Sequence, residues 1–90
     1  MMSHMIINPR VLTDILLNAA RDNAGKGHCE IAAGLFEQAL RKLEDSFGQE
    51  SLELAPVLTE LGDCYETLGR GTHAHRCRSR LSTILLKATE

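Results

Sequence analysis

The residues best suited to chemistry lie in the last third of the chain, where His73, His75 and Cys77 alternate. Imidazole and thiolate groups are common ligands of zinc. On a helix, however, His73 and Cys77 share a face while His75 points away, and the sequence has no Cys-x-x-Cys spacing typical of a zinc site. Cys64 and Cys77 are better interpreted as small core residues. We therefore expect no metal site and no cofactor.

Three arginines, Arg76, Arg78 and Arg80, alternate over the same segment. Alternation spreads them around a helix, whereas a DNA-recognition helix reads bases from one face. The chain also has only three aromatic residues, which are too few for a platform that stacks single-stranded nucleic acid. A small nucleic-acid-associated regulator that uses this basic last helix is therefore the alternative function and not the favoured one.

Catalysis has little support in the sequence. Gly25-Lys26-Gly27 lacks the other positions of a phosphate-binding loop. The sequence contains no recognisable nucleophile with a base and an orienting group, and no paired acids at a spacing typical of catalysis. We expect no catalytic residue, and a protein that binds instead of catalysing.

Length and charge limit the organisation and the partner. The 90 residues allow one domain, residues 1–90, and 43% hydrophobic residues suffice for a packed interior. Residues 30–66 contain nine acidic and two basic residues, whereas residues 70–87 contain five basic and no acidic ones. An acidic middle followed by a basic end suits a protein partner, or a second copy, better than a phosphate backbone.

The sequence gives no sign of a membrane or secretory segment. No apolar run approaches the roughly 18 residues that a membrane-spanning helix needs, and the N-terminus lacks the basic-then-apolar layout of a signal peptide. Three scattered cysteines do not indicate a disulfide framework. We expect a cytoplasmic protein with no membrane partner. Ser3-His4-Met5 has the pattern of a cloning remnant, so we expect the native start at Met5.

Helical periodicity is present in four segments, residues 9–24, 28–47, 52–68 and 72–88. The first begins at an Asn8-Pro9 cap, and Pro56 predicts a bend or a late start in the third. The stripe of the first segment consists of Leu12, Ile15, Leu16 and Ala19. The other stripes contain Cys29, Ala32, Phe36, Ala39, Leu40, Leu43 and Phe47; Leu54, Leu58, Leu61, Tyr65 and Leu68; and Ala74, Cys77, Leu81, Ile84, Leu85 and Ala88. Short loops between the segments predict antiparallel neighbours.

Internal repetition indicates how these helices are organised. When the chain is shifted by 42 residues its halves align: Ile15-Leu16 with Val57-Leu58, Ala19-Ala20 with Leu61-Gly62, Gly27 with Gly69, and Ala32 with Ala74. Small residues at Ala20 and Gly62 are suited to a close helix crossing. The sequence therefore predicts an all-α fold of two tandem antiparallel helix hairpins, about 9–47 and 51–88.

The residues of these hairpins resemble the tetratricopeptide repeat family. The matching positions are Leu58, Leu61-Gly62, Tyr65, Gly69 and Ala74 in the second half and Gly27, Ala32, Phe36 and Ala39-Leu40 in the first. The 42-residue period is similar to the kinesin-light-chain type of repeat, whose extended turn corresponds here to residues 47–58, with Ser51-Leu52 in place of His-Pro. Asn23 and Arg78 depart from the pattern, because they align with Tyr65 and Phe36. A HEAT-type pair and a plain four-helix bundle are the structural alternatives.

The resemblance implies a concave surface, lined by the first helix of each repeat, that holds a peptide. It would carry Asp14, Leu17, Arg21, Thr59, Asp63 and Glu66. Arg21 is the only cation among them, so the resemblance implies a neutral or basic segment of a protein as the partner, with the chain acting as an adaptor or scaffold.

Exposed repeat ends predict self-association. Leu86 and Ser82 would face a missing capping helix, and Val11 and Leu17 flank the stripe of the first helix. A two-fold homodimer would cover both ends. The alternative is that another protein caps them, or that the chain is a fragment.

Overall fold

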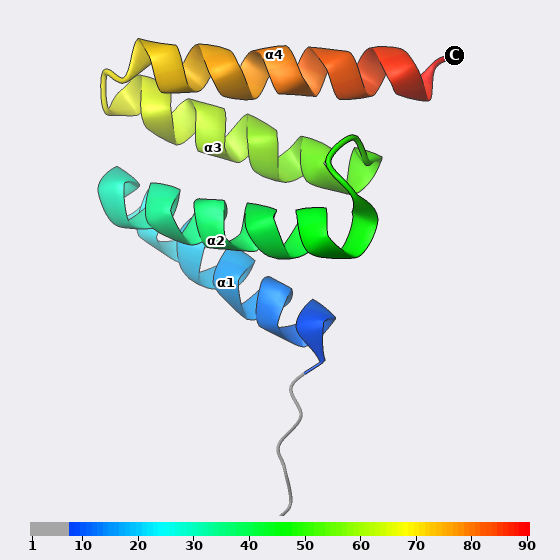
Figure 1. The fold of residues 1–90 in the computed structure, drawn as a ribbon. Helices are drawn as coiled ribbons and strands as arrows, with labels where there is room; N and C mark the ends of the chain where they lie inside the picture. The colour runs from blue at the N-terminus through cyan, green and yellow to red at the C-terminus, as the bar shows by residue number, and fades with distance from the viewer. Residues whose placement is uncertain (1–7) are drawn as a thin grey trace, which may run out of the picture.

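The computed structural model describes residues 8–90, which form four α-helices and one short 3-10 helix, with no strand in that range. The helices are α1 (Pro9–Gly25), α2 (Cys29–Phe47), α3 (Ala55–Thr67) and α4 (Gly71–Ala88), and the 3-10 helix η1 (Leu52–Leu54) precedes α3. α1 packs on α2 and α3 packs on α4, and α2 joins the two hairpins by packing on α3 (Figure 1). The predicted all-α fold of two helix hairpins is confirmed. The expected start at Met5 lies outside the described residues.

Two of the helices, α1 and α3, begin where cap and proline residues of the sequence predict. The Asn8 side chain accepts a hydrogen bond of 2.8 Å from the Arg10 amide, and Pro9 occupies the first turn of α1. Pro56 is accommodated in the same way. η1 takes up residues 52–54, and α3 starts at Ala55, so the proline lies in the first turn, where a missing amide hydrogen is harmless. The late start predicted from Pro56 is confirmed.

The turns inside the two hairpins have the same geometry at a shift of 42 residues. The His28 amide donates to the Asn23 carbonyl and the Arg70 amide to the Tyr65 carbonyl, both at 2.8 Å. Gly27 and Gly69 occupy the same place in each turn, with φ of 82° and 75°. These backbone angles suit glycine, which has no Cβ. The register of 42 read from the sequence is therefore also the register of the backbone in the turns.

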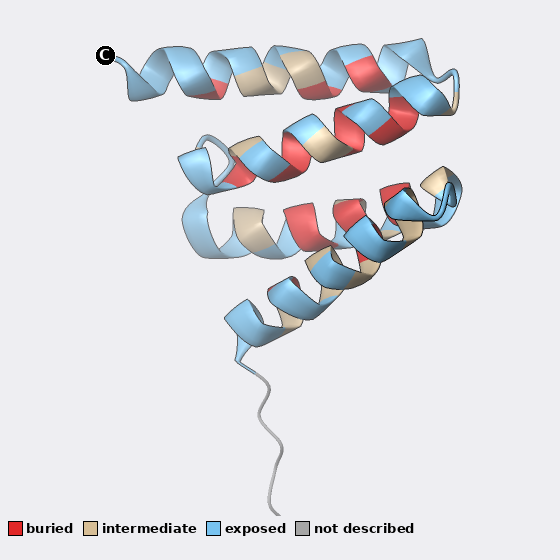
Figure 2. Cartoon of the chain, turned by 180° about the vertical axis from the view of Figure 1, so that it is seen from behind, coloured by how far each residue is buried: buried red, intermediate tan, exposed pale blue. Residues whose placement is uncertain are grey.

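The core lies where α2 and α3 meet and continues between α3 and α4. Its largest fully buried side chains are Phe36, Leu54, Leu58, Leu61, Ile84 and Val57. Figure 2 shows that buried positions are concentrated on α2 and α3, the two inner helices of the stack, and are few on α1. The stripe predicted for residues 52–68 is buried, except for the half-buried Leu68.

α1 differs from the expectation, because its predicted stripe is not its buried face. Only Thr13 and Ala20 are buried in α1, and Leu17 packs partly against the core, whereas Ile15 is 53% exposed. Thr13, Leu17 and Ala20 follow one another at helical spacing on the side that meets α2. The face of the predicted stripe has no second helix against it within the described residues.

Two other stripes reach solvent at their C-terminal ends. Phe47, the last residue of α2, is 51% exposed, and Leu85 in α4 is 45% exposed. α4 has 18 residues and α3 only 13, so the last turns of α4 extend past its partner (Figure 1). Ala88 is exposed for the same reason.

Candidate functional site

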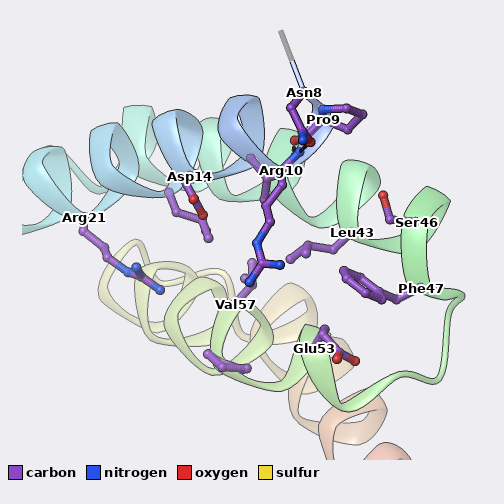
Figure 3. A pocket seen from close by; sticks show the side chains of 13 residues that line it. Asn8, Pro9, Arg10, Asp14, Arg21, Leu43, Ser46, Phe47, Glu53 and Val57 are labelled. Atoms are coloured by element: carbon purple, nitrogen blue, oxygen red, sulfur yellow. Dashed lines mark hydrogen bonds between the residues drawn. The ribbon is translucent and has the colours of Figure 1, made fainter.

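A groove of about 390 Å³ lies between α1 and α3, with the C-terminal end of α2 as its floor (Figure 3). Its lining residues are Asn8, Pro9, Arg10, Thr13, Asp14, Leu17, Arg21, Leu43, Ser46, Phe47, Glu53, Pro56 and Val57. We call this the α1–α3 groove. Its size is at the lower end of the range of ligand-binding clefts.

The groove combines an apolar floor with charged edges. Leu17, Leu43 and Phe47 come from two helices, and the Phe47 ring is half exposed. The Arg10 side chain extends from the start of α1 across the groove, and Asp14 lies one turn further along the same helix (Figure 3). Such a mixture can bury apolar side chains of a ligand and orient its polar groups.

An ion pair connects the two hairpins at the inner end of the groove. Arg21 Nε and Nη2 on α1 each lie 2.8 Å from a carboxylate oxygen of Glu60 on α3. This bidentate hydrogen bonding, with the charge of Glu60, raises the pKa of the Arg21 guanidinium. Because both side chains are partly exposed, the pair contributes little to the stability of the fold.

Four of the six residues predicted for the concave surface line two cavities between α1 and α3 that both include Arg21, and Thr59 and Glu66 line neither. Asp14, Leu17 and Arg21 line the α1–α3 groove. Thr59 is exposed and donates a hydrogen bond to the Ala55 carbonyl of its own helix. Asp63 and Glu66 lie 3.0 and 3.3 Å from guanidinium nitrogens of one side chain, Arg78 of α4. None of these last three lines the α1–α3 groove, but Asp63 and Arg21 together line a second cavity of about 350 Å³ between α1 and α3.

Ten lining residues were not predicted from the sequence: four from Asn8 and the first turns of α1, three from α2, and three from η1 and the start of α3. Phe47 and Leu43 were assigned to the core because they continue the stripe of α2. A signal was available for Phe47, since the final residue of a helix before Gly48 has fewer neighbours than a residue in the interior. No sequence signal placed Arg10 over the groove.

The basic residues at the end of the chain are mostly neutralised by contacts within the chain. Arg70 pairs with Glu30, Arg78 with Asp63 and Glu66, Arg80 with Glu44, and Lys87 with Glu50. Of the five basic residues in this segment, only Arg76 has no acidic partner within residues 8–90. These cations therefore tie α4 to the acidic middle of the chain and do not form a stripe free to contact phosphates.

Two cysteines of the second hairpin are buried in the core, and one of its histidines packs beside an aromatic ring. Burial raises the pKa of the Cys64 thiol to about 11 and also raises that of Cys77. The His73 ring lies 4.9 Å from the Tyr65 ring, measured between centroids. No group of three or more metal-ligating side chains occurs within residues 8–90. In the same range, no helix is long and apolar enough to span a bilayer.

The residues predicted for self-association are all exposed but lie far apart in the fold. Leu86 is 67% and Val11 49% exposed, and Ser82 is also exposed. Val11 is on α1 and the other two are on α4, at opposite ends of the helix stack (Figure 1). A contact between two copies that covers Val11 would involve α1, whereas a contact that covers Ser82 and Leu86 would involve α4.

Comparisons with known proteins identified no relative of this chain. No protein-family model, no curated protein and no solved structure matches the chain.

Proposed function

We propose that this chain is a tetratricopeptide-like protein-interaction module that binds a neutral or basic segment of a partner protein in the α1–α3 groove. The observation that carries the proposal is the half-exposed Phe47 ring on an apolar floor with Leu17 and Leu43. Aromatic side chains that remain accessible in a concave site are typical contributors to binding energy. The 42-residue repeat of the turn hydrogen bonds supports the repeat architecture.

The charges of the groove support the choice of partner. Arg21 is neutralised by Glu60, so the remaining charged side chains of the lining are Arg10, Asp14 and Glu53. A segment with a net negative charge would meet two carboxylates and the guanidinium of Arg10, which has no ion pair within residues 8–90. The same balance of charges in the groove favours a neutral or basic segment.

The nucleic-acid alternative has weaker support, because four of the five cations between Arg70 and Lys87 have acidic partners within the chain. Binding to a phosphate backbone would require those ion pairs to open. Such binding would also weaken steeply with salt.

A displayed library of random twelve-residue peptides, selected on the purified chain, tests the proposal. We expect enriched peptides with apolar residues and no net negative charge. In fluorescence-anisotropy titrations, Phe47→Glu should weaken the binding of these peptides at least tenfold. Leu52→Glu is the matched control, since Leu52 is 52% exposed and does not line the groove, and it should change the affinity less than twofold. A selection that enriches no peptide, or binders that do not distinguish Phe47→Glu from wild type, would refute the groove as the binding site.

A further inference from the structure

The first helices of the two hairpins carry the same apolar face, but within residues 8–90 only one of these faces is covered by a further helix. At a shift of 42 residues, Leu12, Ile15, Leu16 and Ala19 of α1 correspond to Leu54 of η1 and to Val57, Leu58 and Leu61 of α3. These four residues of the second hairpin are at most 1% exposed, whereas Ile15 is 53% exposed and the other three α1 residues are half-buried. The chain therefore contains one covered and one uncovered version of the same surface.

A helix covers this surface on the second hairpin. Leu40 of α2 lies beside Leu58 and Leu61 of α3, at a site that His73 of α4 also lines. Glu37 of α2 accepts a hydrogen bond from the Tyr65 hydroxyl at the same site. The covering helix thus places one face into the junction between the two helices of the hairpin.

The uncovered surface also extends onto the second helix of its hairpin. Ile31 of α2 occupies the position of His73 at the 42-residue shift, and it is 56% exposed. The next position of the same face is Gly34, where an added Cβ would meet no atom within 4 Å. We call Leu12, Ile15, Leu16, Ala19 and Ile31 the open face. It lies on the side of α1 opposite to Asp14, Leu17 and Arg21, so it does not depend on the proposed function of the groove.

The charges around the covered surface indicate that an occupant of the open face should lack acidic flanks. Arg70, Arg80 and Lys87 of the second hairpin bind acids of α2 and the loop after it, at 2.8, 2.8 and 2.7 Å. The corresponding residues of the first hairpin are His28, Gln38 and Asp45. They offer no comparable cations, so an occupant with the acidic flanks of α2 would lose these ion pairs.

A second copy of the chain is poorly suited to the open face. The face that α2 presents to α3 includes Ala33, Phe36 and Leu40, all buried. In α4 the corresponding residues are His75, Arg78 and Ser82, and the Arg78 guanidinium is held by Asp63 and Glu66. Stacking α4 of one copy on α1 of another would place these polar groups against Ile15 and Leu16 without partners.

We propose that the open face binds an amphipathic helix of another protein, which stacks on α1 and α2 as α2 stacks on α3 and α4. The buried stripe of this helix carries a small residue, an aromatic residue and a leucine at the spacing of Ala33, Phe36 and Leu40. It is neutral or basic where α2 has Glu30 and Glu44, whose arginine partners the first hairpin lacks. It is also neutral or basic where α2 has Glu37, because the first hairpin has Asn23 in place of Tyr65, the partner of Glu37. Recognition is of the helix-in-groove type, with anchors three and four residues apart.

A synthetic helix tests this proposal with the intact chain. The probe is a fluorescein-labelled peptide of residues 29–47 in which Cys29 is replaced by serine and the three glutamates by glutamine. We expect the probe to bind the wild-type chain, and Ile15→Glu and Ile31→Glu each to weaken binding at least tenfold. Because both isoleucines are more than half exposed, these variants should keep the helical circular dichroism and the melting temperature of the wild type.

Two controls separate the open face from the groove and from acidic helices. Phe47→Glu should leave the affinity of the probe within twofold of wild type, since Phe47 lines the α1–α3 groove. The same peptide with its glutamates retained should bind at least fivefold more weakly than the probe.

Three results would overturn the proposal. The first is a probe that does not bind the wild-type chain at peptide concentrations up to about a millimolar, the weak end of specific association. The second is a probe that binds Ile15→Glu as well as wild type, which would place it elsewhere, for example in exchange with the chain's own α2. The third is light scattering that shows a wild-type dimer and an Ile15→Glu monomer, because the occupant would then be a second copy.

Discussion

The Tyr65 hydroxyl of α3 lies 2.5 Å from Glu37 Oε2 of α2, and this hydrogen bond joins the first hairpin to the second. Tyr65 is only 7% exposed, and its ring lies beside His73 of α4. Burial, together with donation of the hydroxyl proton to a carboxylate, raises the pKa of Tyr65. Three of the four helices therefore meet around one side chain.

Removing this hydrogen bond should destabilise the protein without changing its fold. We expect Tyr65→Phe to lower the free energy of unfolding by about 1–2 kcal/mol, because a hydrogen bond to a charged group is lost while the ring stays packed. Urea denaturation measures the change. In a double-mutant cycle with Glu37→Gln, the two effects should be coupled by more than about 0.5 kcal/mol. Independent effects would mean that the two side chains do not interact in solution.

The parts of the fold that were predictable from the sequence are those set by local chemistry. Asn8-Pro9 indicated the start of α1, and Pro56 indicated a bend or a late start in the third helix. Gly27 and Gly69, which align at the 42-residue shift, occupy turns with positive φ. The periodicity of residues 52–68 identified a buried face correctly, because α3 has a helix on each side. Local signals of this kind act within a few residues and need no knowledge of the tertiary structure.

What could not be predicted depends on which helix meets which face. Ile15 belongs to an apolar stripe as regular as that of α3, yet the stripe has no covering helix in the described residues. The groove was predicted only for Asp14, Leu17 and Arg21, since the positions of Phe47 and Val57 follow from the packing of α2 against α3. Arg78 aligned with Phe36 in sequence, but its pairing with Asp63 and Glu66 follows from the crossing of α3 and α4.

The close approach of α3 and α4 should not tolerate a large side chain at Gly62. A Cβ added there would lie 3.4 Å from Arg78 Nη1 and 3.5 Å from Cys77 Cβ. Gly62→Leu should therefore force the helices apart and lower the free energy of unfolding by about 1–3 kcal/mol, as measured by thermal and urea denaturation. An unchanged melting temperature would mean that this helix pairing is absent in solution.

Gly34 provides a matched control for Gly62. It also lies inside a helix, but an added Cβ would meet no atom within 4 Å. Gly34→Ala should raise the free energy of unfolding by about 0.5–1 kcal/mol, since alanine loses less backbone entropy on folding than glycine.

Stability should decrease in alkaline solution because of the buried thiols. The Cys64 pKa is about 11 in the folded chain, above its ordinary value of 9.0. As pH rises above 9, the unfolded chain loses this proton first, so the stabilisation present below pH 9 is lost as pH approaches 11. The raised pKa values of Cys77 and Tyr65 act in the same direction.

We expect the free energy of unfolding to fall by on the order of 1 kcal/mol between about pH 8 and pH 10 in the presence of a reductant. Cys64→Ala should show a smaller decrease over the same interval, whatever its stability at neutral pH. An identical pH dependence in the variant and the wild type would show that this thiol is not shielded from solvent in the folded chain.

The two hairpin turns should respond equally to the same substitution. Gly27 and Gly69 have φ of 82° and 75°, and an added Cβ at either position meets no atom within 4 Å. The cost of alanine is then the strain of a left-handed backbone alone, about 1–2 kcal/mol at each site. Asparagine tolerates this region better and should cost less than alanine at both sites.

Gly25→Ala is the control, because Gly25 ends α1 with no positive φ and has equal space around it. This substitution should leave the free energy of unfolding unchanged or slightly increased. Urea denaturation of the set measures these costs, and the values at Gly27 and Gly69 should agree within about 0.5 kcal/mol. A large cost at Gly69 with none at Gly27 would mean that Gly27 does not keep its positive φ in solution. The two turns would then share the 42-residue repeat in sequence but not the same backbone conformation.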